Sequence, residues 1–437
     1  MRAFLLLAII VALAIAAIIR PKIGALAMVW FALARPDVTA WAGDSYPYAS
    51  ILELGTLIGS VKVLGQLAPL WRNPIFRLLL ALLVPILLSV VTAIHPTLCY
   101  QYFWWYASSV VSAVMIPLTI QTEKDFRRLV VIMALSMGWV GSKYGLYGMI
   151  HGGVRYSSGF GGSFADNNTL ALALVMGIPL CWYGRNLVRS FPVRAGLVLA
   201  AFLSIAAVVF THSRGAAIAA IAAFLVILIH ARHRFFMLVA LVLLTAPSVY
   251  LVKDTYFDRM ETLKDTETAE QDESVMDRVE ASRVAWRIFK DYPVMGVGFG
   301  SVNQRMLWRH YADPEFAGAQ LVVHDTYLQM LADSGIFALL TYVALLGGTI
   351  ILLERSSLRL KKAGSPLYEC PLAIEAGLIA FAVGSTFLTR IAFDFLYFLL
   401  MAGAAWLIVE PDHLESLREQ QENLAAEEDP QLQEAGA

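Results

Sequence analysis

Long apolar runs separated by short polar connections make up most of the chain. A membrane helix needs roughly 20 predominantly apolar residues to cross a hydrocarbon core of about 30 Å. The runs predict spans at 3–19, 23–35, 50–70, 76–95, 99–120, 128–150, 168–184, 194–211, 215–230, 235–252, 325–354, 367–388 and 390–409. Because the second run is short, we expect about 12 or 13 spans. The first run resembles the apolar part of a signal peptide, but "RPKIG" and further apolar residues follow it, so we interpret it as a span.

Composition agrees with this pattern. Of the 437 residues, 58% are hydrophobic and 15% charged, and the mean hydropathy is +0.65. A soluble domain is about 45–50% apolar with about a quarter of its residues charged. The three cysteines, Cys99, Cys181 and Cys370, lie in or beside apolar runs and show neither a disulfide framework nor zinc-ligand spacing. The chain is therefore predicted to be an all-α polytopic membrane protein.

Lys and Arg in the short loops give the orientation. The basic connections at 20–22, 72–77, 124–128, 185–194, 232–234 and 355–362 all fall on one side, which is the cytoplasmic side by the positive-inside rule. The opposite, outer side collects 36–49, 96–98, 151–167, 212–214, 253–322 and the turn near 389. The C-terminus is then cytoplasmic.

Four regions follow from the pattern: N-terminal membrane helices over 1–252, a large periplasmic loop over 253–322, C-terminal membrane helices over 323–409, and an acidic, disordered cytoplasmic tail over 410–437. Within the loop, Val275, Val279, Trp286 and Phe289 recur at roughly helical spacing and predict the apolar face of an amphipathic helix. Pro293 and "GVGFGS" end it. No strand precedes these glycines, so they do not form a dinucleotide-binding fingerprint.

Three periplasmic residues could carry chemistry. Arg214 lies in the tight turn "THSRGA", where it could also be a lipid-phosphate contact or a snorkelling helix end. Arg278 lies on the loop helix and could be one charge of a solvated face. His324 stands at the start of a long membrane helix, where a histidine can simply anchor the interface. Together, arginines suit a phosphate or pyrophosphate, and a neutral histidine can take a proton from a hydroxyl. With no metal-binding carboxylate cluster in the sequence, this set describes a transferase whose leaving group is a lipid pyrophosphate.

At this point the chain resembles the O-antigen ligase and polymerase family of bacterial membrane glycosyltransferases. "THSRGA" matches the family's Ser-Arg-Gly turn at Arg214, and "MDRVEASRVAWRIFKDYPVMGVGFG" matches its arginine helix, with Arg278 rather than Arg283 in register. "HDTYLQMLADSGIFA" matches the motif that begins with His324 and reaches Gly335. The chain departs from the family at Asp325, usually Asn or Ser, and at Ala338, often Gly.

A narrower resemblance joins the chain to the exosortase A system-associated O-glycosylation ligases. It rests on "GGSFADNNTLALALVMGIPL" and the N-terminal "RPKIGALAMVWFALARPD". The Asp166-Asn167-Asn168 run is the most specific part. The chain departs from the subgroup at residues 34–37, where the subgroup tends to have Asn-Pro-His.

The resemblance implies a GT-C-like fold and an inverting, metal-independent transfer without cofactor on the periplasmic face. The donor would be a saccharide on undecaprenyl pyrophosphate, and the acceptor a hydroxyl of lipid A-core, a protein or another glycan. In this family's scheme Arg214 and Arg278 hold the pyrophosphate, and His324 is the general base. The implied substrate contacts are Arg155, Asn167, Asn168, Asp325 and Arg283. The other expected partner is the lipid bilayer, and we expect no nucleic-acid partner.

Two other functions stay open. A polymerase of lipid-linked repeat units would share the donor and the mechanism. A transporter or flippase of a lipid-linked saccharide would also need charged groups deep in the spans, since such groups are costly and usually functional. The candidates are Glu53, Lys62, Lys143, Glu375 and Asp394, which form no obvious relay in the sequence; an ion pair between Asp394 and Arg390 that stabilises the bundle is the simplest interpretation.

Overall fold

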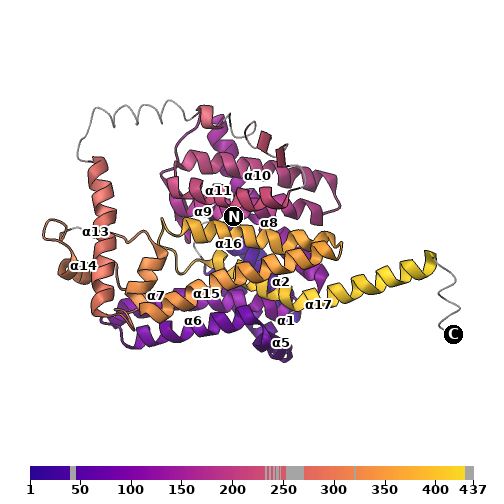
Figure 1. Cartoon of the computed structure of the whole chain (residues 1–437), viewed down its shortest axis with the longest axis horizontal. Coiled ribbons are helices and arrows are strands. Elements are labelled where there is room, and N and C mark those ends of the chain that lie inside the picture. The colour runs from indigo at the N-terminus through magenta and orange to yellow at the C-terminus, as the bar shows by residue number, and fades with distance from the viewer. Residues whose placement is uncertain are drawn as a thin grey trace.

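A bundle of long helices makes up the body of the protein (Figure 1). The computed structural model describes residues 1–39, 46–231, 270–318 and 321–428, together with a few single positions between 234 and 251. The longer helices of the bundle are α1 (Arg2–Ile19), α2 (Pro21–Ala34), α4 (Tyr48–Ser60), α6 (Pro74–Val91), α7 (Pro96–Thr119), α8 (Glu123–Ile150), α9 (Asn167–Gly184), α10 (Phe191–Thr211), α11 (Arg214–His230), α15 (Thr326–Lys362), α16 (Glu369–Gly384) and α17 (Asp394–Glu428). These bounds follow the predicted spans closely, although most of the span predicted at 235–252 lies outside the described residues.

The remaining elements are short or lie at the bundle ends. They are α3 (Pro36–Thr39), η1 (Val61–Gln66), α5 (Leu67–Arg72), η2 (Arg185–Leu187), η3 (Pro366–Tyr368), α13 (Glu270–Asp291), α14 (Arg305–Tyr311) and an antiparallel pair of strands, β1 (Ser158–Gly161) and β2 (Phe164–Asp166). The strands lie in the connection at 151–167.

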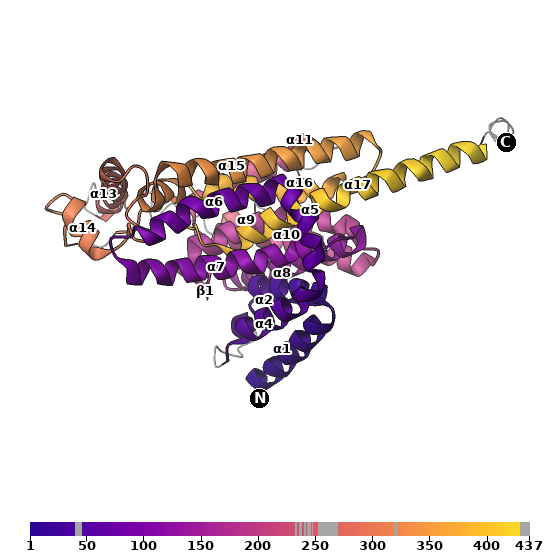
Figure 2. The same ribbon diagram turned by 90° about the horizontal axis from the view of Figure 1, so that it is seen from below.

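The predicted all-α polytopic membrane class is confirmed. In the described part of the chain, nine helices are long and apolar enough to cross a membrane, and α2 and α11 are shorter apolar helices. Large apolar side chains such as Phe4 and Leu5 on α1 and Ile221 on α11 are exposed on the outside of the bundle. Such exposure is unfavourable in water but suits lipid chains. In Figure 2 the helices α1, α2 and α4 project together from one side of the bundle.

Small residues allow the helices of the bundle to approach closely. On α8, a Cβ added at Gly141 would lie 1.9 Å from the Ser204 hydroxyl, and one at Gly145 would lie 2.1 Å from the Leu203 carbonyl oxygen, both on α10. Packing through small residues is the usual route to close helix contact in lipid, where burial of apolar surface drives little association. These glycines fix α8 against α10, next to the loop that precedes α9.

The amphipathic helix predicted within 253–322 is present, but its predicted apolar face was wrong. Helix α13 runs across the end of the bundle, with α14 beside it (Figure 1). Its buried apolar positions are Ala281, Val284, Ala285 and Ile288, whereas Val279 is 38% and Trp286 49% exposed. The side chain of residue 275 lies outside the described ones, and Phe289 is only partly buried. Both apolar strips have helical spacing, so only packing against the rest of the loop decides which is buried.

The glycine-rich segment after α13 docks into a break in α15. Gly335 has φ 79° and ψ −176°, which interrupts the helix. The backbone N–H of Ile336 donates to Pro293 O at 2.9 Å, and Gly298 donates to Asp333 O at 2.9 Å. The buried Asp333 carboxylate accepts the N–H of Val302 at 2.7 Å. These glycines therefore serve close backbone packing.

The C-terminal region also differs from the sequence prediction. Helix α17 continues through Glu428 and extends beyond the bundle, where we expected a disordered tail from residue 410 (Figure 2). A bidentate ion pair between Arg359 and Glu410, at 2.9 Å, ties the start of this extension to α15. Residues 429–437 lie outside the described residues.

Candidate functional site

His324 occupies the turn that leads into α15. Its backbone lies in the left-handed region, with φ 51°, which is uncommon for a residue other than glycine. The next residue, Asp325, caps α15 by accepting the N–H groups of Tyr327 at 2.8 Å and Leu328 at 2.9 Å. In the described part of the chain, no hydrogen bond to the half-buried ring of His324 is found. The backbone conformation thus places the ring at the N-terminal end of α15, and within the described chain its nitrogens are free to bind a substrate.

Charges from three separate segments surround His324. Burial and the positive charges of Arg278 and Arg390 lower the pKa of the imidazole, and the carboxylate of Asp166 acts in the opposite direction. The net effect favours the neutral ring, which is the form that accepts a proton. This environment suits a general base.

Arg278 differs from its neighbours on α13. It is exposed and forms no hydrogen bond through its guanidinium and no ion pair within the described residues. By contrast, Arg287 bonds the buried Glu280 at 3.3 Å and Asp313 at 2.9 Å. Arg283 is 53% exposed and lies 3.7 Å and 3.9 Å from the same two carboxylates. Of these three arginines, Arg278 is therefore the one whose guanidinium is available to an anion.

Arg214 begins α11, directly after the turn that ends α10. Ser213 caps the helix by accepting the N–H of Ala216 at 3.3 Å, and His212 takes a left-handed conformation, φ 54°. Asn167, one of the predicted substrate contacts, donates from its side-chain amide to Thr211 O at 3.2 Å. Gly215 packs against Phe387, where an added Cβ would lie 2.7 Å from the phenylalanine Cβ. The arginine turn thus adjoins both the start of α9 and the connection between α16 and α17.

Arg390 completes the charged group, and sequence reasoning gave it the wrong partner. Instead of pairing with Asp394, its guanidinium lies 3.2 Å from Asp166 and donates to the Thr169 hydroxyl at 2.7 Å. Its backbone N–H donates to the Thr326 hydroxyl at 3.0 Å. Arg390 therefore ties the α16–α17 connection to the starts of α9 and α15. A basic residue on the side where the sequence predicts few Lys and Arg residues was the signal that could have singled it out.

Asp166 has a structural role in the same cluster. It caps α9 by accepting the N–H groups of Asn168 and Thr169, each at 3.0 Å. Burial opposes its ionisation, but a hydrogen bond from the Thr169 hydroxyl, these backbone bonds and the charge of Arg390 outweigh it and lower the pKa of the carboxyl. The Asn168 amide also donates to Asp166, at 3.2 Å. The last of the predicted contacts, Arg155, is exposed and makes no ion pair in the described part of the chain.

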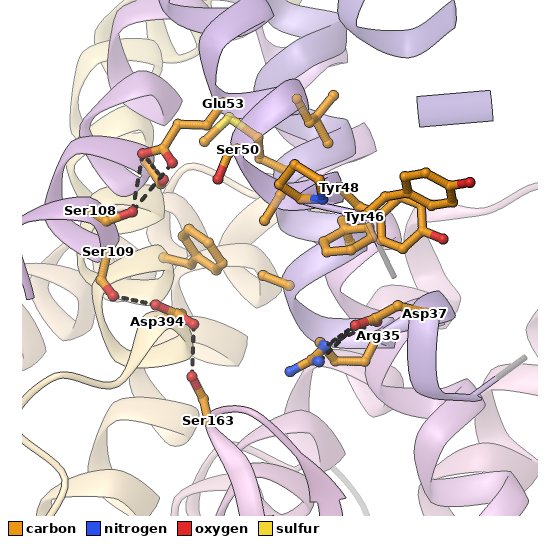
Figure 3. Close-up of a pocket in the computed structure, with 18 residues that line it drawn as sticks. Arg35, Asp37, Tyr46, Tyr48, Ser50, Glu53, Ser108, Ser109, Ser163 and Asp394 are labelled. Carbon is orange, nitrogen blue, oxygen red and sulfur yellow. Dashed lines mark hydrogen bonds and ion pairs between the residues drawn. The ribbon is translucent and has the colours of Figure 1, made fainter. Parts of the chain in front are cut away.

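Two cavities adjoin this charged group. The larger, of about 760 Å³, is lined by Arg390, Asp394, Gln329, Tyr102 and Trp105 among others. The smaller, of about 330 Å³, is shown in Figure 3 and lies among α2, α4, α7 and the start of α17. Ser108, Ser109, Ser163 and Asp394 line both, so the two cavities share a wall.

Two carboxylates of the membrane helices line the smaller cavity, and one of them also lines the larger cavity. Glu53 accepts hydroxyl hydrogen bonds from Ser108 at 3.2 Å and Ser112 at 3.1 Å. Asp394 accepts from Ser109 and, at 2.9 Å, from Ser163 (Figure 3). The sequence showed no relation between Glu53 and Asp394, because 340 residues lie between them in the chain.

Comparison with known families covers most of these residues. Residues 199–343 match the O-antigen ligase family, and residues 1–189 match a family of unknown function. No curated protein matches the chain. The first match contains Arg214, Arg278 and His324; the second contains Glu53, Asp166 and Asn167. The chain is thus a multi-pass membrane protein in which residues 199–343 are similar to the O-antigen ligase family, and this similarity supports glycan transfer of the ligase or polymerase type.

Proposed function

We propose that the protein transfers a glycan from a polyprenyl pyrophosphate to an acceptor hydroxyl at the periplasmic membrane face. The observation that carries the proposal is the environment of His324: a half-buried imidazole, without a hydrogen-bond partner in the described chain, beside the unpaired Arg278. The positive-inside rule supports the periplasmic side, since the Lys- and Arg-rich loops lie at the other end of the spans.

The two arginines of the ligase match supply the electrostatics. In the proposed reaction the guanidinium groups of Arg214 and Arg278 bind the pyrophosphate oxygens, which they fit bidentately. Negative charge grows on the bridging oxygen as the glycosidic bond to the carrier breaks, and fixed positive groups stabilise that charge. The lipid pyrophosphate leaves with the electron pair of the broken bond.

His324 provides the base. The acceptor oxygen forms a bond to the anomeric carbon as its proton passes to the neutral imidazole, and the configuration at that carbon inverts. A positioned general base is worth about 10²–10⁴ in rate. The lowered pKa of His324 keeps the ring neutral, and the left-handed backbone at this residue is the kind of strained conformation found at functional sites.

The acceptor and the product separate the remaining alternatives. A ligase joins a preassembled chain to lipid A-core, protein or another acceptor, whereas a polymerase extends a lipid-linked chain. The narrower resemblance to exosortase A system-associated ligases favours a ligase with undecaprenyl pyrophosphate as carrier in the bacterial inner membrane. The length distribution of the product distinguishes a ligase from a polymerase.

The test compares wild type with His324→Ala, Arg214→Ala and Arg278→Ala in cells lacking the native gene, at membrane abundance matched by immunoblot. Arg309→Ala is the control, because Arg309 is an exposed arginine of α14 in the same loop. We expect the three variants to accumulate lipid-linked glycan on the periplasmic side and lose acceptor-linked glycan by at least about 100-fold, while the control transfers normally. Donor accumulating on the cytoplasmic side would instead indicate a flippase, and normal transfer by His324→Ala would refute the mechanism.

A further inference from the structure

The two adjoining cavities have the chemistry of a saccharide site. Tyr102 and Trp105, whose rings lie 5.5 Å apart edge to face, line the larger cavity with Phe299 and several polar side chains. Each cavity falls in the range of about 300–1,000 Å³ that is usual for small-molecule sites. Aromatic surfaces with a few convergent polar groups form such sites. A sugar ring offers the matching surface, with apolar C–H faces and hydroxyl edges.

A buried polar group on the cavity wall lacks a partner. Gln329 is 5% exposed, and its amide nitrogen donates to Asp333 at 3.0 Å. Its Oε1 atom has no hydrogen-bond partner in the described structure. The Thr389 hydroxyl on the same wall is also unpartnered. A buried polar group without a partner is unfavourable, so a ligand with hydroxyl groups is favoured here.

The charge of the walls selects the kind of saccharide. Arg35 is bound by Asp37 at 2.7 Å (Figure 3), and Arg390 is bound by Asp166. Glu53 and Asp394 form no ion pair within the described residues, and serine hydroxyls are their partners. A carboxylate has about four acceptor positions, so each can take further hydroxyl donors. Uncompensated carboxylates repel phosphates and uronates and suit neutral sugars.

The larger cavity begins beside the base. Arg390, whose charge lowers the pKa of His324, lines the cavity, and so do Leu321 and Val322 just before the histidine. Arg278 and Arg214 line neither this cavity nor the smaller one, as far as the described residues show. The larger cavity is therefore lined by neighbours of His324 and, among the described residues, by neither of the arginines assigned to the pyrophosphate.

We propose that these two cavities form one subsite, which binds the hydroxyl groups of neutral sugar units in a glycan substrate through Glu53 and Asp394. The inference rests on the proposed function, since it supposes that His324 marks the point where two glycans are joined. The saccharide could belong to the donor chain or to the acceptor, and the experiment separates these sources.

The test is a transfer assay with the purified full-length protein and two titrated extracts. The donor extract is lipid-linked glycan from cells that lack this protein, and the acceptor extract is membranes from cells that cannot build the donor. Wild type is compared with Glu53→Gln and Asp394→Asn, which keep the side-chain shape and remove the charge. Glu375→Gln is the control for an acid-to-amide substitution inside the bundle, because Glu375 is a buried acidic residue of α16 that lines neither cavity.

We expect the half-saturating amount of one extract to rise about tenfold or more, the effect of losing one charge-assisted hydrogen bond, with the maximal rate unchanged. A rise for the donor extract identifies the donor glycan, and a rise for the acceptor extract identifies the acceptor. The control should behave like wild type. If Asp394→Asn fails to fold, Glu53→Gln still decides, because its known partners are only two serines of α7.

Unchanged half-saturation for both extracts, or a change in maximal rate alone, would overturn the subsite. His324→Ala in the same assay keeps the two proposals distinct. If that variant loses transfer and Glu53→Gln saturates like wild type, only the subsite fails. If His324→Ala transfers normally, the proposed function itself fails.

Discussion

Replacing Gly335 with alanine should destabilise the protein and displace the segment that follows α13. At φ 79° and ψ −176° the residue occupies a backbone region open essentially to glycine alone, and forcing another residue there costs about 1–3 kcal/mol. The added Cβ would lie 2.1 Å from the Val294 carbonyl oxygen. Relieving that clash breaks the bond from Ile336 N–H to Pro293 O, at a further cost of about 1–3 kcal/mol. Together these effects predict a loss of about 2–6 kcal/mol.

The assay is thermal unfolding of purified wild type and variant in the same detergent, together with glycan transfer at matched abundance. Pro293 and Val294 lie shortly after the end of α13, so displacing them should also move Arg278. Glycan transfer by the variant should therefore be weaker than that of wild type at matched abundance. Gly347→Ala in the same helix is the control, since an added Cβ there meets no atom within 4 Å. Alanine should stabilise that position by up to about 1 kcal/mol. Equal unfolding temperatures for Gly335→Ala and wild type would refute the reasoning.

Three further outcomes are expected. Asp325→Ala should lose the two hydrogen bonds that cap α15 and about 1 kcal/mol of stability, whereas Asp325→Asn should keep most of that stability. Thermal unfolding measures both variants. Arg390→Gln should raise the pKa of His324, because it removes a positive charge and frees the opposing carboxylate, so the acidic limb of the pH–rate profile moves to higher pH; an unmoved limb would contradict this. Arg287→Gln should lower the unfolding temperature more than Arg283→Gln, because the distances from Arg287 to Glu280 and Asp313 are shorter than those from Arg283. Equal unfolding temperatures for the two variants would contradict this.

Hydropathy along the chain was enough to predict the helices and the membrane class, because the cost of leaving backbone groups unpaired in lipid imposes helices on any long apolar run. The local motifs were also readable. The "THSRGA" turn, the arginine helix and the histidine before α15 stand where the sequence predicted them. Their chemical roles stay predictions until the variants are measured.

Tertiary structure decided which side chains meet. The sequence offered two helically spaced apolar strips on α13, and only packing selected Ala281 and Val284 over Val279 and Trp286. Arg390 had a nearby acidic residue in Asp394, yet the turn between α16 and α17 directs it to Asp166, the residue that caps α9. Glu53 and Asp394 lie far apart in the chain and line one cavity because α4, α7 and α17 converge. A sequence pattern records what each helix can bury, whereas the partner of a charge depends on which helices pack together.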